Sequence, residues 1–144
     1  MENRTFIGID YGDRRIGLAR SDLTGLIASP LKTITVKSFD KAVDEIIAIS
    51  KESDSAGMVI GYPVSATGGS QGESCQKVDR FIKRLEKKYT GPIYRVDERY
   101  SSVEAEDIVH LHNKKTGQDK SRLDRMAAAI ILQRFLDERR NEKD

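Results

Sequence analysis

The order of strand-like and helix-like segments constrains the fold of this chain more than any other feature. Strand-like runs at residues 5–10, 16–21 and 26–36 follow one another with no helical segment between them. Two later runs, at 58–61 and 92–96, each follow an amphipathic helical segment. Short turns pair strands antiparallel, whereas a helical crossover pairs them parallel. The order predicts an α/β fold: a mixed five-stranded sheet, antiparallel in its first three strands and then βαβ crossovers, flanked by helices.

Local signals support this order. The continuously apolar run Met58–Gly61 is typical of a strand buried on both faces. Pro30 predicts a bulge or an edge in the third strand. Ser38 is placed to cap a helix that runs to about Lys51, and residues 73–89 repeat apolar side chains at helical spacing.

The C-terminal third is predicted to be mainly helical. Ser101 and Glu104 form a capping-box pattern for a helix to about residue 111, followed by a polar and basic loop at 112–118. Residues 119–139 keep one apolar face, which predicts the last and strongest helix of the chain.

Composition places the chain among globular proteins. Its 144 residues, 33% of them charged, suit a single domain over residues 1–144. The one cysteine, Cys75, cannot form an intramolecular disulfide and is expected to pack in a helix, and no apolar run approaches the ~20 residues of a membrane span. With no signal-peptide pattern at the N-terminus, we expect a cytoplasmic protein that acts away from membranes.

Three carboxylates are the candidate catalytic residues and metal ligands. Asp10 ends the first strand-like run, Glu98 follows the last one, and Asp124 is expected in the first turn of the last, apolar helix. Ligand sites in open α/β sheets gather at the carboxyl ends of the strands. Hard cations bind carboxylate oxygens, so the three acids together would suit Mg²⁺ or Mn²⁺.

Each acid also has a simpler interpretation. Asp10 could begin the turn at Tyr11–Gly12. Asp124 could form a capping box with Ser121, since acids are favoured in a first helical turn. Asp97 competes with Glu98, because adjacent residues of an extended segment face opposite ways.

Basic residues near the acids are candidate nucleic-acid contacts. Arg14 and Arg15 stand close to Asp10 in the first hairpin, and a further group surrounds Asp124 in the sequence. A phosphate backbone would be attracted to such a group with salt-sensitive affinity. The second group comprises Lys114, Lys115, Lys120, Arg122 and Arg125.

Four segments, in this order, carry a specific resemblance: GIDYGDRRIGLARSD, GYPVSATGGSQGES, VDERYSS and KSRLDRMAAAIIL. Together they resemble the YqgF family, also called RuvX, of RNase H-like proteins. The resemblance implies a metal-dependent nuclease that processes the 5′ end of precursor 16S ribosomal RNA. The family's acidic site then corresponds to Asp10, Glu98 and Asp124.

The sequence departs from the family pattern at two places. The family loop often reads close to GLPLNMDGSxG, whereas residues 61–70 here lack the asparagine and the aspartate. The family's DERLT is DERYS at residues 97–101, which keeps the carboxylate and a hydroxyl. A further difference is from the wider superfamily. Resolvase-type relatives usually carry an acid just after the fourth strand, where this chain has Gly61-Tyr62-Pro63.

Other functions remain open at this point. A Holliday junction resolvase acting on branched DNA and a non-catalytic RNA-binding factor of ribosome assembly would both suit the fold. An actin-like or sugar-kinase-like ATPase shares the Asp-x-Gly motif, but such proteins pair two domains around the nucleotide. The expected partner is nucleic acid, and the expected state is a monomer or a weak homodimer.

Overall fold

A computed structural model describes residues 4–63, 72–97 and 118–143. Within these ranges, strands and helices follow one another in the predicted order. The elements are β1 (Thr5–Asp10), β2 (Arg15–Ser21), β3 (Ala28–Thr35), α1 (Phe39–Glu52), β4 (Ser55–Tyr62), α2 (Glu73–Glu86), β5 (Ile93–Asp97) and α4 (Gln118–Lys143).

The five strands form one mixed sheet in the order β3-β2-β1-β4-β5. β1 pairs antiparallel with β2, and β2 with β3, whereas β4 lies parallel to both β1 and β5. The predicted sheet is therefore confirmed. Pro30 lies on β3, the edge strand, next to a shift in its register against β2, so both expected effects of the proline are present.

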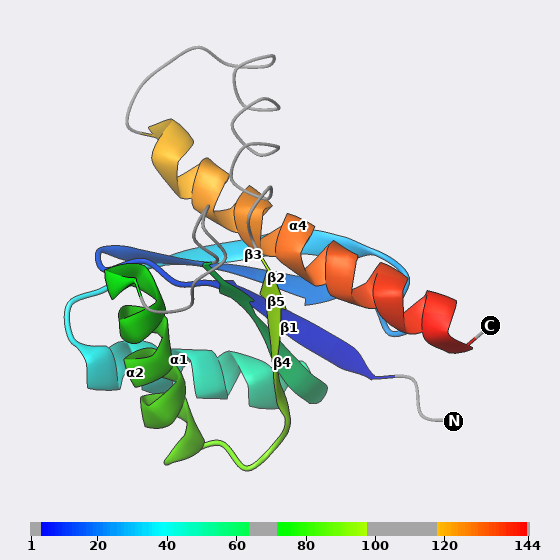
Figure 1. Cartoon of the computed structure of the whole chain (residues 1–144), viewed down its shortest axis with the longest axis horizontal. Coiled ribbons are helices and arrows are strands. Elements are labelled where there is room, and N and C mark those ends of the chain that lie inside the picture. The colour runs from blue at the N-terminus through cyan, green and yellow to red at the C-terminus, as the bar shows by residue number, and fades with distance from the viewer. Residues whose placement is uncertain (1–3, 64–71, 98–117, 144) are drawn as a thin grey trace.

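Helices cover both faces of the sheet (Figure 1). α1 and α2 lie on one side, and α4 crosses the other side diagonally. Side chains alternate along β1, so this strand contributes to the cores on both faces of the sheet. Ile7 and Ile9 belong to the core under α1 and α2, and Phe6 belongs to the core under α4. Met58, Val59 and Ile60 of β4 are all fully buried, as expected for a strand covered on both faces.

The N-terminal helix follows the sequence signals closely. The Ser38 side chain accepts a hydrogen bond from the Lys41 amide at 3.2 Å and caps α1. α2 is shorter than predicted and ends at Glu86. Cys75 near its start is buried, with Sγ 2.8 Å from the Pro63 carbonyl oxygen, which confirms its packing role.

α4 begins within one residue of the predicted start, but Ser121 and Asp124 do not cap it. The helix already includes Gln118, so Ser121 lies inside it and Asp124 is beyond the first turn. The capping-box interpretation of Ser121 and Asp124 is therefore wrong. Tertiary contacts explain the difference, because the Ser121 carbonyl accepts a hydrogen bond from the Thr33 hydroxyl at 2.7 Å. The helix and loop expected at 101–117 lie outside the described residues.

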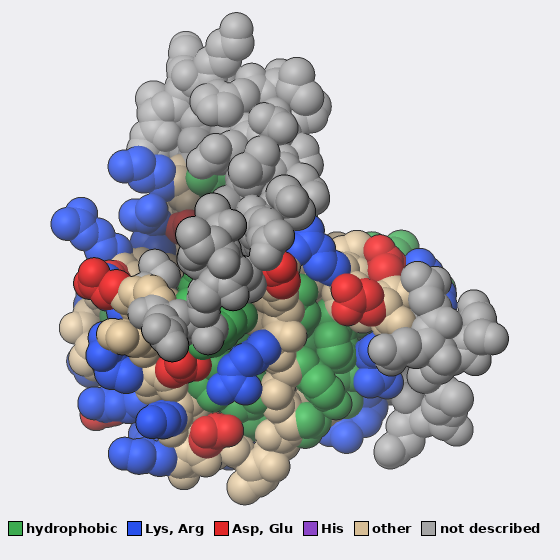
Figure 2. All heavy atoms as spheres, viewed as in Figure 1, with side chains coloured by type: hydrophobic (Ala, Val, Ile, Leu, Met, Phe, Trp, Pro, Cys, Tyr) green, Lys and Arg blue, Asp and Glu red, His purple; other side chains and the backbone are tan. Residues whose placement is uncertain are grey.

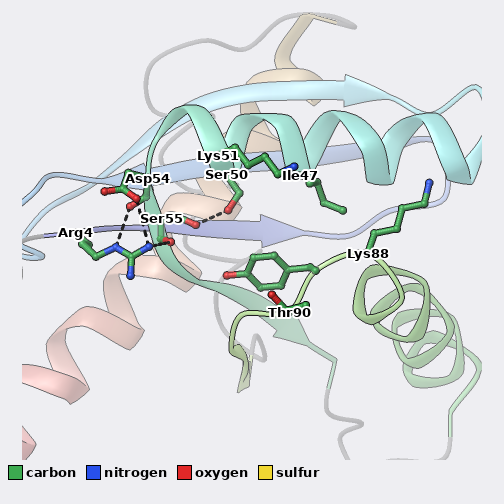
Figure 3. A pocket seen from close by; sticks show the side chains of 9 residues that line it. Arg4, Ile47, Ser50, Lys51, Asp54, Ser55, Lys88 and Thr90 are labelled. Carbon is green, nitrogen blue, oxygen red and sulfur yellow. Dashed lines mark hydrogen bonds and ion pairs between the residues drawn. The ribbon is translucent and has the colours of Figure 1, made fainter.

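A hollow of about 300 Å³ opens at the end of the sheet where β1 and β4 begin, opposite the end at which Asp10 lies (Figure 3). Arg4 closes one side by donating to the Ser55 carbonyl at 2.7 Å and to the Asp54 carboxylate at 3.4 Å. Lys51 and Lys88 also line it, near the C-terminal ends of α1 and α2. Cations there complement the negative ends of the helix dipoles, so these basic groups stabilise the fold.

Among the described residues, no helix is long and apolar enough to span a lipid bilayer.

Candidate active site

Gly17 is the residue at which β1, β2 and α4 come together. It lies opposite Asp10 in the antiparallel ladder of β1 and β2. A Cβ atom added to Gly17 would lie 2.0 Å from the backbone oxygen of Asp124. Only a glycine permits the helix to approach the strand so closely. Asp10 and Asp124, 114 positions apart in the sequence, therefore both adjoin this one glycine.

Asp10 lies on the side of the sheet that carries α4. Along β1, Phe6 packs in the core beneath α4, and a Cβ added to Gly8 would lie 2.7 Å from Cβ of Leu132. Strand alternation places Asp10 on the same side as these two residues. Asp10 is the last residue of β1, at the carboxyl end of the strand, and is half-buried.

Asp124 is half-buried and makes an ion pair. Arg15 Nε donates to Asp124 Oδ2 at 2.6 Å, and the two side chains are 33% and 20% exposed. Burial raises the pKa of Asp124 above its ordinary value, although Arg15 and Arg125 both act to lower it. At this carboxylate, burial therefore outweighs the effect of the two arginines.

Thr33 fixes the N-terminal part of α4 over the sheet. It pairs with Gly17 from the other side of β2, so Asp10, Gly17 and Thr33 form one line across three strands. The Thr33 hydroxyl donates to the Ser121 carbonyl and accepts a 3.2 Å hydrogen bond from Arg125.

Sequence reasoning missed the positioning roles of Gly17 and Thr33. The available signal was a glycine inside a strand, which often marks a close backbone approach. Thr33 had no comparable signal, because its partners lie 88 and 92 positions away.

Three of the predicted site residues, Glu98, Lys114 and Lys115, lie outside the described residues. Asp97, the competitor of Glu98, is exposed and follows Val96, which packs beneath α4. By alternation Asp97 lies on the opposite side of the sheet from Asp10. The part of the chain that the structure describes contains no group of three or more His, Cys, Asp or Glu side chains able to hold a metal ion. Two of the three predicted acids, Asp10 and Asp124, adjoin the same glycine, Gly17.

The predicted basic residues divide into two kinds. Arg14, Lys120 and Arg122 are exposed. Basic side chains stand out around the N-terminal part of α4 in Figure 2. Arg15 and Arg125 are instead half-buried, in contact with Asp124 and Thr33 respectively.

Replacing Asp124 by Asn is expected to leave the melting temperature unchanged or to raise it. Folding raises the pKa of this carboxyl, so the protonated group stabilises the fold at pH values below its ordinary pKa. That stabilisation is lost as the pH rises through the pKa of the group in the folded protein. At pH 7.5 the ionised side chain therefore costs stability, which the amide avoids. The gain should reach at most about 3 °C, the effect of about 1 kcal/mol at this size.

Thermal melts at pH 7.5 in a metal chelator measure this effect. Asp13→Asn is the matched control, because Asp13 forms an exposed ion pair with Lys77 and should change little. A fall of several degrees for Asp124→Asn would mean that the ion pair with Arg15 is a structural anchor.

Solved structures with similar folds include two junction-resolving proteins. One is RuvC of Thermus thermophilus in complex with a Holliday junction substrate, with a TM-score of 0.56 and 13% identity over 94% of this chain and 95% of that chain. The other is the yeast mitochondrial Holliday junction resolvase Ydc2, with a TM-score of 0.54 and 11% identity over 97% and 83%. At these identities the likeness is one of fold.

Sequence relatives are much closer. A protein of Crocosphaera subtropica named "Putative pre-16S rRNA nuclease" is 44% identical over 97% of this chain and 97% of its own length. A protein of the same name from Fusobacterium nucleatum is 43% identical over 93% and 97%. The model of the RuvX family, described as Holliday junction resolvase, matches residues 4–138. This match and the identity to these relatives show that the chain belongs to the RuvX family of nucleases.

Proposed function

We propose that this protein is a divalent-metal-dependent hydrolase that cuts phosphodiester bonds at the 5′ end of precursor 16S ribosomal RNA. The observation that carries the proposal is the meeting of Asp10 and Asp124 at Gly17, on one face of the sheet. The relatives named for this activity match nearly the whole chain, which supports the choice of substrate. Such a protein would work in the cytoplasm, where Cys75 stays reduced.

The donor atoms on the described residues fit a hard cation. Asp10 and Asp124 offer carboxylate oxygens, which Mg²⁺ and Mn²⁺ prefer. Glu98 is the proposed third ligand, since Asp97 lies on the opposite side of the sheet. A divalent ion bound there would lower the pKa of a bound water and neutralise charge on the leaving oxygen.

The protein's own residues would hold the substrate. Lys120 and Arg122 lie on the exposed side of α4 close to Asp124, and Arg14 is exposed next to the start of β2. Contacts from such side chains to phosphates position a nucleic acid without reading its sequence. Lys114 and Lys115, which precede α4 in the sequence, are proposed to extend this surface. Each phosphate contact should make binding more sensitive to salt.

Two other functions are alternatives to this nuclease activity. The family description and the fold of the RuvC neighbour support a Holliday junction resolvase. Symmetric cutting of a four-way junction needs two copies of the site, so that function implies a homodimer, whereas a monomer suffices to trim RNA. A non-catalytic RNA-binding factor would not require paired acids in a half-buried position.

Cleavage of two labelled substrates distinguishes these functions. The first is a 5′-extended precursor of 16S rRNA and the second is a four-way DNA junction, each incubated with purified protein and Mn²⁺. The proposal predicts cleavage of the RNA near the mature 5′ end and little effect on the junction. Symmetric cutting of the junction alone would favour the resolvase. Failure to cut either substrate, by folded protein that binds the RNA, would favour the binding factor.

A further inference from the structure

The ion pair between Arg15 and Asp124 differs from the other ion pairs of the described residues. Its two side chains are 33% and 20% exposed, whereas every other described pair includes at least one side chain that is 37% exposed or more. Those other pairs link surface groups, such as Arg84 with Asp40, and contribute little to stability. The Arg15 pair is instead partly withdrawn from water, beside the candidate metal site.

The contact is made through Nε of Arg15. A bidentate arginine–carboxylate pair uses two nitrogens in parallel, and that arrangement is the stronger one. Here the bond to the carboxylate joins one nitrogen, Nε, to one oxygen, Oδ2. Arg15 therefore supplies the positive charge that a half-buried carboxylate needs, through a contact that another cation could replace.

The position of Arg15 points to the same role. It is the first residue of β2, two residues before Gly17, and it shares the α4 side of the sheet with that glycine. Arg125 lies next to Asp124 in the sequence, but its guanidinium bonds to the Thr33 hydroxyl, where it helps to hold α4 over β3. Of these two arginines, only Arg15 is bonded to the carboxylate that the proposed metal would need.

We propose that Arg15 is the internal counter-cation of Asp124 and that a bound divalent metal displaces it. This inference rests on the proposed function, because it assumes that Asp124 is a metal ligand. Metal and guanidinium are both cations, and in close proximity they repel each other. Metal binding therefore releases Arg15, and its long side chain becomes available to a phosphate of the substrate. The metal-free protein keeps a counter-charge on its half-buried carboxylate, and the loaded protein gains an arginine for binding.

A structural role for Arg15 predicts the opposite effect of its loss on metal affinity. A carboxylate has two oxygens, so Arg15 on Oδ2 could instead orient Asp124 while a metal binds Oδ1. Loss of Arg15 would then weaken metal binding, as loss of an orienting partner typically does, by about 10–100-fold. If Arg15 competes with the metal, its loss strengthens metal binding.

Calorimetric titration of the full-length protein with Mn²⁺ at pH 8 tests the inference. Arg15→Gln should bind Mn²⁺ about three- to tenfold more tightly than wild type, while its melting temperature without metal falls. Arg20→Gln is the matched control, because Arg20 is an exposed arginine of the same strand and contacts Ser53 at 3.3 Å. It should bind Mn²⁺ within about twofold of wild type, since exposed charges are screened at a distance. Unchanged or weaker binding by Arg15→Gln would overturn the inference.

The variant Asp124→Asn distinguishes failure of the proposed metal site from failure of the role proposed for Arg15. If this variant loses Mn²⁺ binding but Arg15→Gln shows no gain, the metal site stands and only the role of Arg15 is wrong. If Asp124→Asn binds Mn²⁺ as well as wild type, the proposed metal site itself is wrong, and the inference fails with it.

Nuclear magnetic resonance gives a readout that does not depend on affinity. The Arg15 Nε–H signal, identified by its absence in Arg15→Gln, should be protected from solvent exchange in the metal-free protein. Saturation with Mg²⁺ should remove that protection, with the same midpoint as a parallel calorimetric titration of wild type with Mg²⁺. A signal that stays protected at saturating Mg²⁺ would contradict displacement.

Discussion

Replacing Asp10 by Asn should reduce cleavage of precursor rRNA by at least about a thousandfold, the scale on which loss of a group essential to the chemistry reduces kcat. The amide has nearly the same shape but lacks the charge that binds a divalent cation. The fold should be unaffected, because the pairing of Asp10 with Gly17 is made by backbone groups. The melting temperature should stay within about 3 °C of wild type, which at this size corresponds to about 1 kcal/mol.

The measurement is single-turnover cleavage with the variant in excess over labelled RNA, together with a thermal melt. Asp13→Asn is the control: Asp13 lies in the same hairpin, is exposed, and pairs with Lys77 at 2.7 Å. It should cut at close to the wild-type rate. If Asp10→Asn kept more than a tenth of the wild-type rate, Asp10 would not be a metal ligand for the reaction.

The largest effect on stability is expected from Gly17→Ala. The added methyl would lie 2.0 Å from the Asp124 carbonyl oxygen and 2.3 Å from its carbonyl carbon, so α4 has to move away from β2. The clash is with backbone, which cannot rotate aside as a flexible side chain can. We expect a loss of about 3 kcal/mol or more, the upper range for overpacked sites. That loss corresponds to a fall of roughly 6–12 °C in melting temperature.

Gly72→Ala provides the comparison. A Cβ at Gly72 would meet no described atom within 4 Å, and its φ of −72° suits any residue. Gly72 is the N-cap of α2, where alanine is disfavoured, so the cost should be at most about 1 kcal/mol. Chemical denaturation of both variants measures the difference. Gly17→Ala should also lose activity in its folded fraction, because moving α4 carries Asp124 away from Asp10. A Gly17→Ala variant as stable and active as wild type would show that the close approach is not needed.

The parts of the fold that the sequence predicted are those with local signals. The apolar run Met58–Gly61 was correctly interpreted as a buried strand because both faces of β4 are covered, and Ser38 was a sufficient signal for the start of α1. Pro30 marked the edge strand because proline lacks the donor that an inner strand needs.

The parts that escaped prediction depend on contacts between distant residues. Ser121 and Asp124 have the spacing of a capping box, yet their partners are Thr33 and Arg15, 88 and 109 positions away. These long-range contacts hold the N-terminal part of α4 on the sheet and override the local signal. Arg15 was expected to face nucleic acid, and only its distance to Asp124 reveals that it is engaged within the protein.

The most direct test of the proposed metal site is a crystal structure of the protein soaked in Mn²⁺, with the ion located by its anomalous scattering. If Asp10 and Asp124 form one metal site, the strongest anomalous peak should lie within about 2.0–2.3 Å of a carboxylate oxygen of each residue, the range for oxygen ligands of small divalent cations. An ion bound elsewhere, or no peak near the two acids at saturating Mn²⁺, would show that Asp10 and Asp124 do not form one metal site.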